Sequence, residues 1–95
     1  MPKAYWIAHV TVTNPDHYKH YASDAPIAFK KYGATILARG GLSEQMEGCG
    51  RPRNVVIEFP SLQAALDCYR SAEYQSARAK RIGAGEADIV IVDGV

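Results

Sequence analysis

The chain has 95 residues, of which 47% are hydrophobic and 22% charged, and this composition is typical of one small folded domain covering residues 1–95. Its 11 Lys and Arg residues nearly balance 10 Asp and Glu residues, so no charge field of one sign attracts nucleic acid or an anionic membrane. No apolar run approaches the roughly 20 residues that span a bilayer, so we expect no membrane partner.

The cysteines and the N-terminal residues indicate the cellular compartment in which we expect the protein. Cys49 and Cys68 are not spaced as a CxxC pair or as metal ligands, which favours two reduced thiols. Residues 1–5 contain no basic leader, apolar segment or cleavage site. We therefore expect a cytoplasmic protein.

Residues 4–13 form the first predicted strand, because they are rich in aromatic and β-branched types. One side of this strand is wholly apolar and consists of Trp6, Ala8, Val10 and Val12. The other side mixes apolar bulk with one titratable group and consists of Tyr5, Ile7, His9 and Thr11.

A helix is expected to begin at Asn14-Pro15, where Asn14 supplies a capping side chain and Pro15 needs no hydrogen-bond partner. Apolar residues then recur at three- and four-residue steps until Gly33. Pro26 interrupts this pattern, so we predict a kink or break near residue 24.

The second strand is predicted at residues 34–39, with a bulge at Gly40-Gly41 and a continuation through residues 42–47. A turn at residues 48–53 leads to a third strand at residues 54–59, which Pro60 ends. Ser61 caps the next helix and Ser71 caps a further helical segment. The last strand is predicted at residues 87–92.

The resulting order is β-α-β-β-α-β. It predicts an α+β, ferredoxin-like protomer with a four-stranded antiparallel sheet and its helices on one face. The other face would then be bare, although it carries the apolar side chains of Tyr5, Ile7, Val56, Val90 and Val92. Because apolar patches of this kind usually mark an interface or a ligand groove, we expect a homodimer in which a second copy covers this face.

The sequence resembles one family of small bacterial proteins, domain of unknown function 1330, over nearly its whole length. The similarity rests on the segments YWIAHV at 5–10, KYGA at 31–34, ARGG at 38–41, VIEFPS at 56–61 and SAEYQS at 71–76. The chain has Ala72 where family members often have Pro. The resemblance implies a dimeric α/β barrel and no settled activity. Related branches include cofactor-free monooxygenases, lactone isomerases and haem-degrading enzymes, but a fold does not determine a function.

His9 and Glu58 are the candidate catalytic residues, because neighbouring strands would place an imidazole and a carboxylate on the open sheet face. His9 would act as general acid or base and Glu58 would orient it. The predicted small-molecule pocket on that face is lined by Tyr5, Ile7, Arg39, Val56 and Tyr21. Arg39 would hold an anionic group of the unknown ligand.

Less specific interpretations of the same residues remain open. His9 and Glu58 would equally suit a structural polar pair at a dimer interface, Arg39 a salt bridge, and Tyr21 the core. The function is therefore either a cofactor-independent enzyme for proton transfer or isomerisation, or a non-enzymatic module whose sheet face serves only dimerisation.

Sequence motifs argue against other classes. His17 and His20 are three residues apart on the first helix, so a surface metal site or a haem ligand is conceivable, but no HExxH motif or third ligand supports it. No GxGxxG, P-loop or GxSxG element occurs, and the third strand lacks the stacking aromatics of RNA-binding sheets. We therefore expect no metal, no cofactor and no nucleic-acid partner.

Overall fold

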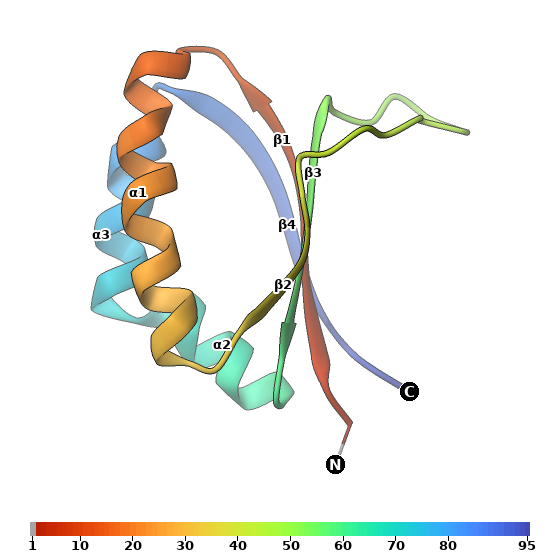
Figure 1. The fold of residues 1–95 in the computed structure, drawn as a ribbon, viewed down its shortest axis with the longest axis vertical. Helices are drawn as coiled ribbons and strands as arrows, with labels where there is room; N and C mark the ends of the chain where they lie inside the picture. The colour runs from red at the N-terminus through yellow and green to blue at the C-terminus, as the bar shows by residue number, and fades with distance from the viewer. Residues whose placement is uncertain (1) are drawn as a thin grey trace.

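Within residues 2–95, which the structure describes, four strands form one antiparallel sheet and three helices cover one face of it (Figure 1). Met1, which the predicted domain includes, lies outside the described residues. In this computed structural model the elements are β1 (Ala4–Val12), α1 (Pro15–Lys31), β2 (Thr35–Arg39), β3 (Arg53–Phe59), α2 (Leu62–Arg70), α3 (Ala72–Arg81) and β4 (Gly85–Asp93). The strand order is β2-β3-β1-β4, so the predicted ferredoxin-like fold is confirmed.

The central strand β1 divides the molecule into two sides. Its predicted apolar row points toward the helices, where Trp6, Ala8 and Val10 are buried and Val12 is half-buried, and Ala4 extends the buried row. The opposite row, with Tyr5, Ile7 and His9, is half-buried on the open face of the sheet. Successive residues of a strand point to opposite faces, which explains why one segment supplies both a core and an uncovered surface.

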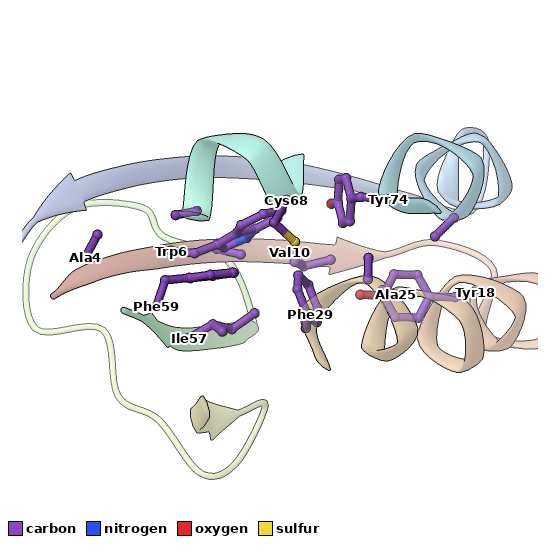
Figure 2. Close-up of a cluster of buried hydrophobic side chains, with 14 of the residues drawn as sticks. Ala4, Trp6, Val10, Tyr18, Ala25, Phe29, Ile57, Phe59, Cys68 and Tyr74 are labelled. Carbon is purple, nitrogen blue, oxygen red and sulfur yellow. The ribbon is translucent and has the colours of Figure 1, made fainter. Parts of the chain in front are cut away.

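Trp6 is the centre of the aromatic core (Figure 2). Its ring packs edge-on against Phe29 of α1 at 5.2 Å and Tyr74 of α3 at 4.9 Å between ring centroids. It also stacks on Phe59 of β3 at 6.0 Å. Edge-to-face and offset stacked pairs each contribute about 0.5–1.5 kcal/mol beyond the burial of apolar area. One side chain therefore connects the sheet to both of these helices.

The helix starts follow the predicted capping residues. Asn14 Oδ1 accepts a hydrogen bond from the backbone N–H of His17 at 3.2 Å. Ser61 Oγ accepts from Ala64 N, and Ser71 Oγ accepts from Tyr74 N, both at 3.1 Å. Each cap satisfies an amide that the first helical turn leaves unpaired.

Of the predicted kink or break near residue 24, the break is wrong, because α1 runs as one helix through Pro26. A proline inside a helix removes the hydrogen bond to the carbonyl four residues earlier. Here that carbonyl belongs to Ala22, which is exposed, so water can replace the missing donor. Gly33, with φ of 74°, follows the helix end as predicted.

Strand β2 differs most from its prediction. It ends at Arg39, and residues 42–47 do not continue it, so that part of the prediction is wrong. The register shift lies between Ile36 and Ala38, at Leu37, rather than at Gly40-Gly41. Gly40 instead adopts a φ of 66° and turns the chain into a loop of residues 40–52. This loop projects on the side of the sheet opposite the helices (Figure 1).

None of the helices in the described part of the chain is long and apolar enough to cross a membrane.

Replacing Trp6 with alanine should lower the free energy of unfolding by about 3–5 kcal/mol, because the substitution leaves a cavity between the sheet and two helices. Denaturant unfolding followed by circular dichroism measures this loss. Ile27→Ala is the matched control, since Ile27 on α1 is 63% exposed and its truncation should change the stability by less than about 0.5 kcal/mol. Equal effects of the two substitutions would contradict the central role of Trp6.

Candidate functional site

A cavity lies between α1 and the helix-covered face of the sheet, with a volume of about 80 Å³. Its walls come from all four strands, from α1 and from the end of α3. Most of them are apolar or aromatic and include Trp6, Val10, Tyr18, Phe29, Ile36 and Ile57. The small side chains of Ala22 and Ala25 leave room on the α1 side.

Three arginines line this cavity at different depths. Arg39, at the end of β2, is exposed, Arg53, at the start of β3, is half-buried, and Arg81, at the end of α3, is only 9% exposed. No aspartate or glutamate among residues 2–95 belongs to the lining. The cavity therefore combines an apolar interior with an excess of positive charge.

Two tyrosines of α1 face two of these arginines. The Arg53 guanidinium carbon lies 6.0 Å from the centre of the Tyr18 ring, and that of Arg81 lies 5.0 Å from the centre of the Tyr21 ring. Such cation–π contacts contribute roughly 0.5–2 kcal/mol. They hold the guanidinium groups without neutralising them, so both positive charges remain available to a ligand.

A chain of hydrogen bonds connects the deepest arginine with Tyr21. Arg81 Nη1 donates to Tyr74 Oη at 3.2 Å, and the hydroxyls of Tyr74 and Tyr21 share a hydrogen bond of 2.9 Å. When Tyr74 donates its proton to Tyr21, the Tyr21 proton is free for a group in the cavity. Burial, with the neighbouring Tyr74 as a second cause, raises the pKa of Tyr21 above its ordinary value. Tyr21 is therefore a neutral donor at physiological pH.

The five residues of the predicted pocket do not line one site, so that prediction is corrected. Arg39 and Tyr21 line the cavity under the helices, whereas Tyr5, Ile7 and Val56 lie on the open face. The shift at Leu37 is the reason, because it places Arg39 opposite Val55, which lines the same cavity. An unshifted strand would have placed Arg39 on the open face.

His9 and Glu58 share the open face but do not pair with each other in the chain. His9 Nδ1 forms a 2.6 Å hydrogen bond with Asn54 Oδ1, and Lys3 Nζ donates to Glu58 Oε1 at 2.8 Å. The register pairs Tyr5 with Glu58 and His9 with Asn54, which separates the two candidate groups by four residues, roughly 13 Å, along the strands. Neither residue lines the cavity under the helices.

The cavity includes three residues that the sequence did not identify as site residues, Tyr18, Arg53 and Arg81. Arg53 fell in the predicted turn at residues 48–53, and Tyr18 fell within the first predicted helix. The available signal was Arg81, a charged residue that continues the helical spacing of the buried residues Tyr74 and Ala77. A charge on a buried stripe needs a partner, which indicates a site.

The remaining candidate groups lie elsewhere. His17 and His20 are exposed on α1, with ring centroids 5.7 Å apart, and Asp24 pairs with Lys80 rather than with either histidine. Residues 2–95 contain no group of three His, Cys, Asp or Glu side chains placed to hold a metal ion. Both cysteines are unpaired, and burial raises the pKa of the Cys68 thiol to about 12.

Residues 3–95 match the family described as domain of unknown function 1330, and the chain belongs to that family. A comparison with proteins of curated function gives no match.

Solved structures share the fold at low sequence identity. A protein of unknown function from Rhodopseudomonas palustris is 17% identical, with a TM-score of 0.72 over 99% of this chain and 83% of its own. SnoaB from Streptomyces nogalater, described as a cofactor-independent oxygenase, is 8% identical, with a TM-score of 0.69 over 96% and 91%. A protein from Bacteroides fragilis, described as dimeric and ferredoxin-like, is 12% identical, with a TM-score of 0.64 over 96% and 95%.

The buried tyrosine pair should make folding sensitive to alkaline pH. The pKa of Tyr21 is raised in the folded chain, so above its ordinary value of 10.0 the unfolded chain loses a proton that the folded chain retains. The free energy of unfolding should therefore fall as the pH rises above about 10, and it should fall less steeply in Tyr21→Phe. Urea unfolding at a series of pH values measures both slopes. Tyr32→Phe, outside this network, should follow the wild type, and identical slopes in all three proteins would contradict the assignment.

Proposed function

We propose that this protein is a homodimer that binds a small organic molecule in the cavity between α1 and the sheet. The observation that carries the proposal is the cavity's lining, in which apolar and aromatic walls surround a few converging polar groups. Ligand sites in proteins typically have this composition. The volume of about 80 Å³ is well below that of sites for drug-sized molecules, so the ligand is compact.

Binding fits this cavity better than catalysis by its own residues. Its lining contains no histidine, carboxylate, lysine or cysteine among residues 2–95. Arginine remains protonated in proteins, and Tyr21 is a neutral donor because its pKa is raised. The cavity therefore offers positive charge and hydrogen-bond donors but no general base for proton abstraction.

The open face of the sheet supports the homodimer. Val90 and Val92 of β4 are 54% and 46% exposed, and Ile7 and Val56 beside them are half-buried. The loop of residues 40–52 extends past this face and exposes Leu42 and Met46. A second copy would cover both regions at once, and a structural neighbour of the same fold is described as dimeric.

A catalytic role of His9 and Glu58 is the second candidate function. A shallow depression on the open face, bordered by His9, Cys49 and Asp88, supports the His9 part of this role, because a small molecule there would contact the imidazole, whereas Glu58 lies outside the depression. In a homodimer this depression would lie beside the partner. Cofactor-independent proton transfer at His9 thus stays a prediction, as does the alternative that His9 and Glu58 only satisfy polar groups at the interface.

Ala22→Leu should abolish ligand binding, because the larger side chain would fill the cavity from its α1 side. Trp6 is the single tryptophan of the chain and lines the cavity, so its fluorescence can report binding in a screen of small organic molecules. Ala79→Leu, at an exposed position of α3, is the matched control and should retain binding. A screen without ligands, or ligands that bind Ala22→Leu normally, would refute the cavity as the site.

Val90→Glu should convert a two-chain particle into a one-chain particle, because the substitution places a charge in an apolar interface. Light scattering at micromolar concentration measures the mass. Ile27→Glu adds the same charge on an exposed position of α1, on the other side of the molecule, and should leave the mass at two chains. A wild-type mass of one chain would remove the homodimer from the proposal.

A further inference from the structure

We infer that the ligand of the cavity is a compact organic carboxylate, whose charged end binds Arg39, Arg53 and Arg81 and whose apolar part contacts the aromatic wall. This inference rests on the proposed function, because it names the chemical class of the molecule that the cavity holds. Three features of the cavity support the inference: positive charge without acidic partners, buried hydrogen-bond donors, and an apolar remainder of the lining.

The cavity arginines differ from most of the other cations in residues 2–95, which form salt bridges. Arg39, Arg53 and Arg81 form no salt bridge with any residue from 2 to 95. Five of the eight other cations do find carboxylates, in the pairs Lys3–Glu58, Lys19–Asp16, Lys31–Glu73, Lys80–Asp24, Arg51–Glu86 and Arg51–Asp88. Positive charge therefore accumulates where no acidic side chain is within reach.

Burial makes this accumulation costly without a counter-charge. Arg81 is 9% exposed, and its hydrogen-bonding partner Tyr74 is neutral. Arg53 Nε is buried and has no hydrogen-bond partner within the described residues. A buried charge or donor that lacks a partner is destabilising. A bound anion would supply both the charge and the acceptor that are missing.

The available donors suit a carboxylate. A guanidinium group presents parallel N–H donors that match the two oxygens of a carboxylate, and Tyr21 offers a hydroxyl proton from the opposite wall. The backbone makes room for this arrangement at Gly40, where an added Cβ atom would lie 2.9 Å from Arg53 Cζ. Glycine at this position lets Arg53 lie against the chain.

The rest of the lining distinguishes an organic acid from an inorganic anion. Phe29, Ile36 and Ile57 offer no hydrogen bonds to the far side of a phosphate or sulfate ion, and Trp6 offers at most its single indole N–H. A carboxylate with a short apolar chain or ring would instead place one end against arginine and the other against these side chains. The burial of that apolar part adds to the binding free energy.

The test compares acids with their neutral amides, which have nearly the same size and shape. Acetate, butyrate and benzoate are each titrated beside acetamide, butyramide and benzamide at constant ionic strength, with Trp6 fluorescence as the readout. Sodium phosphate is a further arm. We expect at least one acid to bind about tenfold or more tightly than its amide, because only the acid forms charge-assisted hydrogen bonds.

Substitutions then locate the charge recognition. Arg53→Met and Arg39→Met should each weaken the binding of that acid about tenfold or more and leave the amide unchanged. Arg51→Met is the control, since Arg51 pairs with Asp88 and Glu86 outside the cavity and its loss should not affect the acid. Circular dichroism checks folding, and Arg39 is exposed, so at least this variant should fold normally.

The possible outcomes separate this inference from the proposed function. If an amide binds as tightly as its acid, or phosphate binds as tightly as the best acid, the inference is overturned while cavity binding stands. Unchanged acid binding in both Arg53→Met and Arg39→Met also overturns it. If no acid binds, the carboxylate is refuted, and the proposed function itself fails only if the screen also yields no ligand sensitive to Ala22→Leu.

Discussion

The packing of all the described helices on one face of the sheet is the constraint on which the rest of the structure depends. It forces the central strand to bury one row of side chains and to leave the other uncovered. Trp6 fills the space between sheet and helices, and the volume that it leaves toward Tyr18 and Tyr21 becomes the cavity. The uncovered row creates the apolar surface that a second copy would cover. The proposed ligand site and the proposed interface are therefore two results of the same asymmetry.

Local signals made most of the fold predictable. Alternating apolar residues identified the buried row of β1, and the side chains of Asn14, Ser61 and Ser71 marked helix starts, because a cap acts on amides only two or three residues away. The continuity of α1 through Pro26 was not predictable in the same way. The carbonyl that Pro26 leaves unpaired belongs to Ala22, and the exposure of this residue is a property of the packed structure and not of the neighbouring sequence. Residues 42–47 left the sheet for a similar reason, since their alternation had no neighbouring strand to pair with.

Some residues of the candidate site could be predicted from the sequence, but the position of the site in the fold could not. Arg39 and Tyr21 were expected to contact a ligand, and both line the cavity, yet the expected pocket was on the other face. The cavity collects residues from elements far apart in the sequence, so no spacing rule could have assembled it. Arg81 could have been noticed from its place on the buried helical stripe, but Arg53 acquires its significance only when the structure brings it to the same cavity without an acidic partner. The separation of His9 from Glu58 likewise follows from the strand register, which pattern analysis does not determine.

The irregularity at Leu37 has a consequence for how relatives of this chain are compared. One extra residue in an edge strand reverses the parity of every position after it, so a basic side chain at the strand's end would point inward in a relative with the extra residue and outward in a relative without it. Aligned sequences would show the same arginine in both. An arginine that is conserved in an alignment therefore need not have a conserved environment. Before a binding role is transferred between relatives, the register of this edge strand against its neighbour must be known.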